Sequence, residues 1–151
     1  MSKAFRFPLQ RILNFKDKIA DEKSRHFQRS LAEVEREKQE LAEIESTKTA
    51  ALSEQRSREN EEQVSLRDIR LAESHVSQLN DRMEQQEKTI AQRKVAAESA
   101  RQELLKATKE KRVIEKLRER QFAEHLRNER QRETVVENEL AIRITQREQG
   151  S

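Results

Sequence analysis

The side chains of this chain best suited to metal binding or acid–base catalysis are three histidines and 29 carboxylates. None of His26, His75 and His125 has a second histidine three or four residues away, the spacing that places two ligands on one helical face. The chain has no cysteine, so it has neither a thiolate nucleophile nor a soft metal ligand. The sequence therefore predicts surface histidines and no catalytic, cofactor or metal site.

Two other features argue against an enzyme. The single glycine is Gly150 and the single proline is Pro8, so there is no glycine-rich loop to hold phosphate groups. The carboxylates are spread among helix-forming residues, and on exposed helical faces they lack the burial that raises a carboxyl pKa for acid catalysis. We therefore expect a protein that binds other proteins, takes no small molecule and catalyses no reaction.

The elements that carry these side chains are predicted by a seven-residue repeat. With 40% charged and 32% hydrophobic residues, the 151-residue chain has less apolar content than a globular domain of this length needs. A disordered chain does not keep such a repeat, which instead indicates a coiled coil that needs a partner helix. One row of the repeat is Ile69, Val76, Met83, Ile90, Ala97 and Leu104. The second row is Ala72, Leu79, Ala100, Ala107 and Ile114, interrupted by Gln86 and Arg93.

The partner helix is predicted to be the N-terminal half of the same chain. Apolar residues vanish between Ser53 and Gln63, and Ser65 can then cap a new helix, with Asp68 bonding back to it and Val64 and Ile69 as a hydrophobic staple. The prediction is one coiled coil over residues 1–151, with a first helix over 8–58, a turn over 59–64 and a second helix over 65–148. The alternative is one continuous helix with a polar stretch inside it.

A register test favours the hairpin. If facing residue numbers sum to 124, large side chains in one helix meet small ones in the other, as close packing requires. Leu13, Ala20, Phe27, Val34 and Leu41 then face residue 111, Leu104, Ala97, Ile90 and Met83. The predicted fold is an all-α, antiparallel two-helix coiled-coil hairpin with a longer C-terminal helix.

The distribution of charge fits this fold. Residues 1–29 carry 8 basic and 3 acidic groups, and residues 101–132 carry 11 basic and 6 acidic groups. Residues 30–62, which lead into the turn, carry 5 basic and 10 acidic groups. Antiparallel pairing places the two basic segments side by side, which indicates either an acidic partner or a solvated face.

Helix one is long enough to pair only to about residue 115, so residues 116–148 are predicted to overhang. Their apolar residues keep a helical spacing, and an unpaired apolar stripe of this kind usually binds a partner. A frayed tail and self-association of two tails are the alternatives. We expect truncation after Lys116 to leave the hairpin folded and to remove a partner. The candidate partner-binding residues are Leu117, Phe122, Leu126, Val136, Leu140 and Ile144, with Arg118 and Arg120.

Nucleic acid and membranes are weaker candidates as partners. Acidic residues interleave throughout 101–132 and aromatic residues make up only 3% of the chain, so a nucleic-acid-binding coiled coil is a remote alternative. No apolar run approaches the ~20 residues of a membrane span. The N-terminus also lacks the apolar core of a signal peptide, so a cytoplasmic location is expected.

Three stretches resemble the FliJ family of flagellar export proteins. Phe5-Arg6-Phe7-Pro8-Leu9-Gln10-Arg11-Ile12-Leu13 is similar to the Phe-x-Leu-x-x-Leu/Val-Leu pattern with which that family enters its first helix. Ile114-Glu115-Lys116-Leu117-Arg118-Glu119-Arg120 resembles its Glu-Lys-Leu-x-Glu-Arg stretch. Glu133, Glu139, Leu140 and Ala141 fit its closing Glu…Asp-Glu-x-Ala pattern, with Asn138 where Asp is usual.

The resemblance implies a soluble component of the type III export apparatus, built like the central stalk of rotary ATPases. It implies the export ATPase ring, the export gate protein FlhA and substrate chaperones as partners. The termini of the stalk would enter the ring, and the gate would be contacted nearer the turn. The protein would be cytoplasmic and associated peripherally with the inner-membrane apparatus through these partners. The alternatives are a YscO-like stalk of virulence type III secretion and a generic coiled-coil scaffold.

Overall fold

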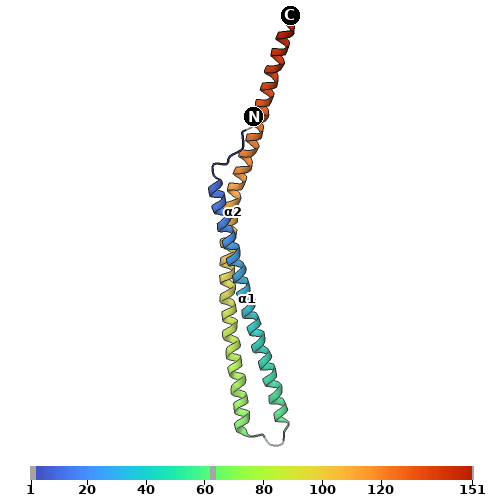
Figure 1. The fold of residues 1–151 in the computed structure, drawn as a ribbon. Helices are drawn as coiled ribbons and strands as arrows, with labels where there is room; N and C mark the ends of the chain where they lie inside the picture. Colours follow the sequence, from blue (N-terminus) through green and yellow to red (C-terminus); the bar gives the residue numbers. More distant parts are fainter. Residues whose placement is uncertain (1–2, 62–63, 151) are drawn as a thin grey trace. The chain divides into compact units, whose positions relative to one another are not determined.

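The computed structural model describes residues 3–61 and 64–150 of the chain. It contains two helices, α1 (Gln10–Glu59) and α2 (Leu66–Gln149), which hold 50 and 84 residues, and the described residues form no strand. The helices run antiparallel and pack against each other (Figure 1), so the fold is the predicted all-α hairpin with a longer second helix. The chain divides into two compact units: unit 1 holds the described residues up to Ala20 and from Lys106, and unit 2 spans Asp21–Leu105.

The start of each helix has a local cause. The N–H of Gln10 donates a hydrogen bond to the carbonyl of Phe7 at 3.1 Å, and Pro8 fits this first turn because it has no N–H to satisfy. At the start of α2, the N–H of Asp68 donates to Ser65 Oγ at 3.1 Å. The predicted cap at Ser65 is therefore confirmed, and it satisfies one of the N–H groups that a helix start leaves open. Of the predicted turn, Glu62 and Gln63 lie outside the described residues.

Unit 2 packs along one seam between the two helices. Leu79 and Ala100 are each 2% exposed, and small side chains alternate with large ones as close packing requires. All the seam positions predicted for this unit are buried or half-buried. They are Phe27, Val34, Leu41, Ile69, Val76, Met83, Ile90, Ala97 and Leu104.

The two polar interruptions of the repeat both contact α1. The buried amide of Gln86 donates from Nε2 to the backbone carbonyl of Glu37 at 2.8 Å and to its Oε2 at 2.6 Å. Arg93 Nη1 lies 3.4 Å from Glu33 Oε2. A polar side chain inside a coiled-coil seam fixes the register at some cost in stability, and Gln86 is placed to do this here.

Unit 1 pairs the first turns of α1 with α2 beyond residue 105. Phe7, Leu13, Ala20 and Ala107 are buried, and Lys16 Nζ lies 3.0 Å from Glu110 Oε2. The hydrogen bond that Lys16 donates, together with its charge, holds the pKa of Glu110 below the usual carboxyl value. The residue numbers of the Lys16–Glu110, Lys23–Glu103 and Glu33–Arg93 pairs each add up to 126, which is close to the predicted 124.

Candidate partner-binding site

The segment before α1 packs on α2 in unit 1. The ring of Phe5 meets the ring of Phe122 edge to face, with centroids 5.3 Å apart and planes at 67°. The same ring lies 5.6 Å from the ring of His125, and Phe7 is only 8% exposed. Aromatic pairs in this geometry are stabilising beyond the area that they bury. Residues 3–9 therefore form a clasp, the N-terminal clasp, over the part of α2 around Phe122.

This clasp corrects one expectation from the sequence, which left no intramolecular partner for α2 beyond about residue 115. The expectation counted only helical residues, which advance 1.5 Å each. A non-helical segment advances up to about 3.5 Å per residue, so a few residues before α1 reach more than a turn farther along α2. The sequence signal was the pair Phe5 and Phe7, two aromatic residues in a chain that has only five.

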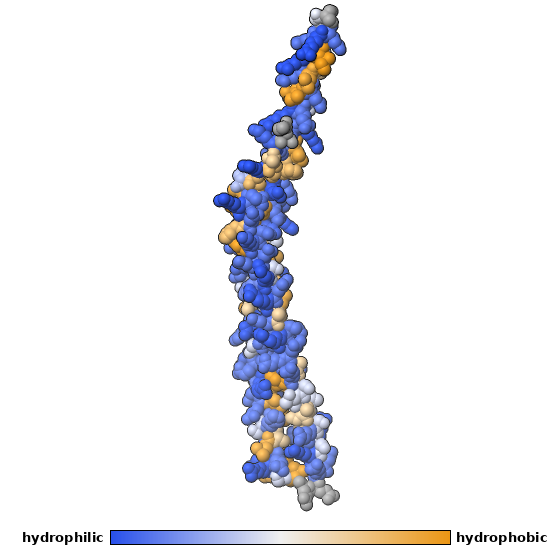
Figure 2. Space-filling model, viewed as in Figure 1, coloured by the Kyte–Doolittle hydropathy of each residue, from blue (hydrophilic) through white to orange (hydrophobic). Residues whose placement is uncertain are grey.

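Beyond the clasp, nothing in the described chain covers α2. Glu129 is half-buried, whereas every residue from 130 to 150 is exposed. Apolar side chains nevertheless continue through this uncovered segment, and Figure 2 shows them as orange groups at the surface near the C-terminal end of α2. Their exposed fractions lie between 52% and 57%. They are Val135, Val136, Leu140, Ile142 and Ile144.

The predicted partner-binding residues fall into two groups. Leu117, Phe122 and Leu126 are 37%, 46% and 42% exposed, and Phe122 is already in contact with the clasp. Val136, Leu140 and Ile144 all lie in the uncovered segment. Arg118 and Arg120 are exposed but stand two residues apart, about 200° around the helix, and so occupy different sides of α2.

Arg120 belongs to a larger feature that the sequence reasoning missed. At spacings of three and four residues along α2 stand six exposed cations, with Ala123 between them and no acidic residue in the row. Such spacing places all of them on one helical face. None forms an ion pair with a described residue. This basic face consists of Lys109, Arg112, Lys116, Arg120, Arg127 and Arg130.

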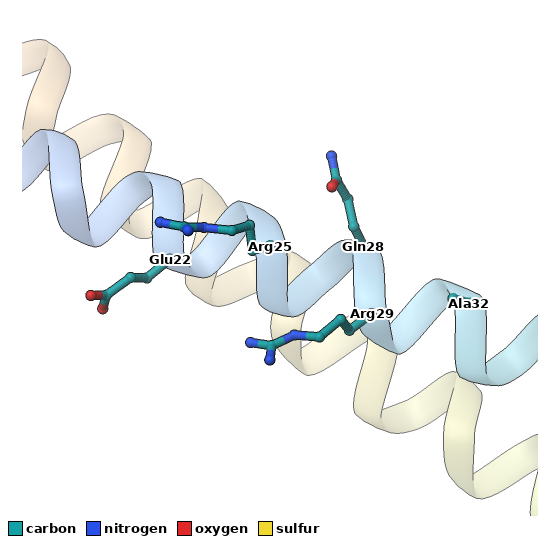
Figure 3. Close-up of a pocket in the computed structure, with 5 residues that line it drawn as sticks. All are labelled: Glu22, Arg25, Gln28, Arg29 and Ala32. Carbon is teal, nitrogen blue, oxygen red and sulfur yellow. The ribbon is translucent and has the colours of Figure 1, made fainter.

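The described surface of unit 2 has features of a different kind. A shallow depression there is lined by Glu22, Arg25, Gln28, Arg29 and Ala32, all from α1. In Figure 3, Gln28 points away from Glu22 and Arg29, so the polar groups do not converge on one point. An open surface of this kind cannot exclude water, and its geometry suggests no catalytic step.

The three histidines differ in their surroundings. His26 and His75 are exposed, and His125 is half-buried beside Phe5. Among residues 3–61 and 64–150, no three histidines or carboxylates gather in a group that could hold a metal ion. Within the same ranges, neither helix contains a stretch long and apolar enough to span a membrane.

Comparison with known families decides the family of the chain. The family Flagellar FliJ protein matches residues 5–150. The chain belongs to the FliJ family. Comparisons with curated proteins and with solved structures found no match. Membership of the FliJ family makes this a protein associated with flagellar export.

The stretches that resemble FliJ lie in or beside the features of unit 1. Residues 5–13 form the N-terminal clasp and the first turn of α1. Residues 114–120 include two members of the basic face, Lys116 and Arg120. Leu140 and Ala141 lie in the uncovered segment. The FliJ-like motifs and the candidate partner-binding surface therefore share the same parts of the chain.

Proposed function

We propose that this FliJ-family chain is a stalk and chaperone component of flagellar type III export. It joins the export ATPase ring to the export gate protein FlhA and handles substrate chaperones. The observation that carries the proposal is the basic face of α2, which is followed along the helix by the uncovered apolar segment and lies in the same unit as the N-terminal clasp. Binding and positioning, without catalysis, are the functions that such a surface supports.

The basic face supports contact with an acidic surface of the ATPase ring. Six cations at helical spacing cover about 32 Å of α2, because each helical residue advances 1.5 Å. A row of cations without an acidic residue in it attracts an oppositely charged partner and orients it during encounter. The apolar residues of the uncovered segment can then supply the desolvated contacts that carry most of the binding energy.

The gate contact belongs to a different part of the chain in this proposal. Residues 30–62 carry 10 acidic and 5 basic groups and lead into the turn between α1 and α2. A surface with the opposite charge would not compete for the partner of the basic face, so two partners can be held at once. The chain would work in the cytoplasm, held at the inner membrane through these partners.

Charge reversal tests the ATPase contact. The triple variant K116E/R120E/R127E alters exposed residues of the basic face, so the hairpin should stay folded while binding to the export ATPase weakens at least about tenfold. The matched control R70E/R82E/K94E changes the net charge equally, at exposed positions of unit 2. Binding of purified ATPase to each immobilised chain measures the effect. Equal affinities for the two variants would contradict the proposed ATPase contact.

Truncation separates the apolar segment from the clasp. Truncation after Lys116, the cut considered in the sequence analysis, would also remove Phe122 and His125, the residues against which Phe5 packs. A cut after Glu129 keeps the clasp, and the described residues that it removes, 130–150, are all exposed. The shortened chain should unfold at the same temperature as the full chain and lose a partner among the ATPase, the cytoplasmic domain of FlhA and the substrate chaperones. Normal binding of all three would show that the segment is not needed.

A further inference from the structure

The uncovered segment has an ordered pattern of charge around its apolar residues. Glu133, and Glu129 just before the segment, precede Val136 and Leu140, and two arginines follow them at positions 143 and 147. Glu129 is half-buried, and its Oε1 lies 3.9 Å from Arg132 Nη1 of the same helix. Val136 and Leu140 stand 7 and 11 residues beyond the half-buried Glu129, so they lie on the side of α2 that the rest of the chain covers up to that point. The seam side of α2 therefore continues past the reach of α1 and of the clasp, and it carries apolar side chains there.

We propose that a second copy of this chain binds the uncovered segment, with its own α2 running antiparallel and a two-fold axis level with Asn138. In heptad terms, Glu133, Leu140 and Arg147 are a positions, and Glu129, Val136 and Arg143 are d positions. An antiparallel coiled coil places each a residue opposite a d residue of the other helix. This inference rests on the chain alone and does not depend on the proposed function.

The antiparallel register matches both polarity and charge along the seam. Val136 of each copy faces Leu140 of the other, which gives two apolar layers at the centre. On either side, Glu133 faces Arg143 of the second copy, and farther out Glu129 faces Arg147. A parallel pair would instead place Glu opposite Glu and Arg opposite Arg in four layers of the seam, which is unfavourable.

The positions that flank the seam do not reverse this preference. In the antiparallel pair, Glu137 faces Glu137 of the second copy, and Glu139 faces Glu139 of the second copy. These two repulsive contacts stand against four attractive ones in the seam. In the parallel pair Arg132 would meet Glu137 of the second copy twice, which gives two attractive contacts against four repulsive ones. The seam pairs outnumber the flanking pairs in both cases, so charge favours the antiparallel orientation.

The small size of the contact and the facing glutamates predict weak, concentration-dependent pairing. About 20 residues of α2 from each chain span the contact, but only those at seam and flanking positions, roughly half of them, touch the second copy, which is fewer than a stable protein–protein interface usually uses. The paired state covers Val136 and Leu140, which belong to the apolar surface that an export partner would need. Self-pairing would therefore keep these side chains covered until such a partner is present.

Charge swapping tests the register directly. In sedimentation equilibrium of the full chain, the wild type should form dimers as its concentration rises to about 0.5 mM. The single variants Glu133→Arg and Arg143→Glu each place like charges together at two symmetric positions, so each should weaken dimer formation by about tenfold. A one-to-one mixture of the two variants should recover the wild-type affinity, because the two arginines of one chain then face the two glutamates of the other.

The controls make the outcome decisive. Arg127→Glu reverses a charge on the basic face, outside the proposed contact, and should leave dimer formation unchanged. Circular dichroism of each variant should show unchanged helix content, since all the substituted side chains are exposed. A wild type that stays monomeric over this range would overturn the proposal, as would a mixture that associates no better than its components.

The absence of cysteine permits a second, covalent test of orientation. Under mild oxidation, a mixture of V136C and L140C chains should form the mixed disulfide dimer, because these positions face each other in the antiparallel pair. Each variant alone should form little disulfide-linked dimer. Rapid cross-linking of V136C to itself would indicate parallel pairing and would contradict the proposed register.

Discussion

Two regions of α2 are similar in sequence character and opposite in environment. In residues 66–105, the apolar positions of the repeat face α1, and Leu79 is 2% exposed. In residues 130–149 apolar side chains also recur, yet Leu140 is 52% exposed. The difference does not lie in apolar content, since both regions belong to one highly charged helix. The difference is that α1 packs against residues 66–105, whereas no helix of the described chain packs against residues 130–149. The apolar stripe therefore stabilises the fold in the first region and is available for partners in the second.

The charged residues follow the same division. In unit 2, Gln86 and Arg93 interrupt the apolar repeat and are both satisfied by α1, through Glu37 and Glu33. In the uncovered segment, Glu133 and Arg143 form no ion pair with a described residue. Polar groups in the paired region thus specify how the chain folds on itself, whereas those in the uncovered segment remain available to specify a partner.

The largest expected effect is the contrast between two leucines of α2. Leu79→Ala should lower the free energy of unfolding by about 2–4 kcal/mol, because it removes buried methyl groups and leaves a gap in the seam. Leu140→Ala should change it by less than about 0.5 kcal/mol, because Leu140 is already exposed and alanine favours the helix. Thermal unfolding followed by circular dichroism gives both values. Equal losses would show that Leu140 is covered and would break the comparison.

A smaller effect of opposite sign is expected at Gln86. Gln86→Leu should raise the free energy of unfolding by about 1 kcal/mol, since a buried amide is replaced by an apolar side chain of similar size. Glu37, which loses its partner, is only half-buried and can be solvated. Chemical denaturation of the two chains measures the change. A decrease would mean that the Gln86–Glu37 contact stabilises the hairpin beyond its role in setting the register.

The clasp tests where the paired region ends. Phe5→Ala should cost about 1 kcal/mol, because the edge-to-face contact with Phe122 is lost along with its buried area. The matched variant Phe15→Ala removes a phenylalanine that is 61% exposed and should cost less. Hydrogen exchange around Phe122 should accelerate only in Phe5→Ala. If neither variant changes exchange there, the clasp does not hold in solution and the uncovered segment begins earlier.

The smallest effect comes from acid. Hydrogen bonds from Lys23 and Lys16, with their charges, lower the pKa of Glu103 and of Glu110 below the ordinary 4.5. A lowered folded-state pKa stabilises the fold above the unfolded value, and this contribution is lost as pH falls through the folded value. Stability should therefore decline modestly between about pH 5 and pH 3, as these directions imply. The double variant K16Q/K23Q should show a shallower decline in unfolding temperature, and an equally steep decline would exclude these pairs as its cause.

The hairpin could be predicted from the sequence because its signals are local and repeated. The seven-residue spacing from Ile69 needs a partner helix, and Ser65 with Asp68 marks where the second helix starts. In the structure, the N–H of Asp68 donates a hydrogen bond to Ser65 Oγ at the start of α2. Each of these signals depends on neighbours within a few residues, which a sequence displays directly.

Other features depend on contacts between residues far apart in the chain. Phe5 packs on Phe122 through a segment with no periodic pattern, so counting helical residues could not place it. Glu37 and Glu33 could be named as partners of Gln86 and Arg93 only if the register between the two helices were known to within one turn. The repeat alone gives only an approximate sum for the numbers of facing residues. The basic face is visible in the sequence as the three- and four-residue spacing of its cations, but it lies on the side of α2 opposite to the apolar stripe.

Amide hydrogen exchange along α2 in dilute, monomeric chain tests the central comparison most directly. Buried and paired helix exchanges through global unfolding, while a helix without tertiary contacts opens locally. Residues 66–128 should therefore exchange slowly and residues 130–149 much faster, with the change close to Glu129. Addition of the export ATPase should slow exchange in the second range. Uniform slow exchange along the whole of α2 in the dilute chain would contradict the account.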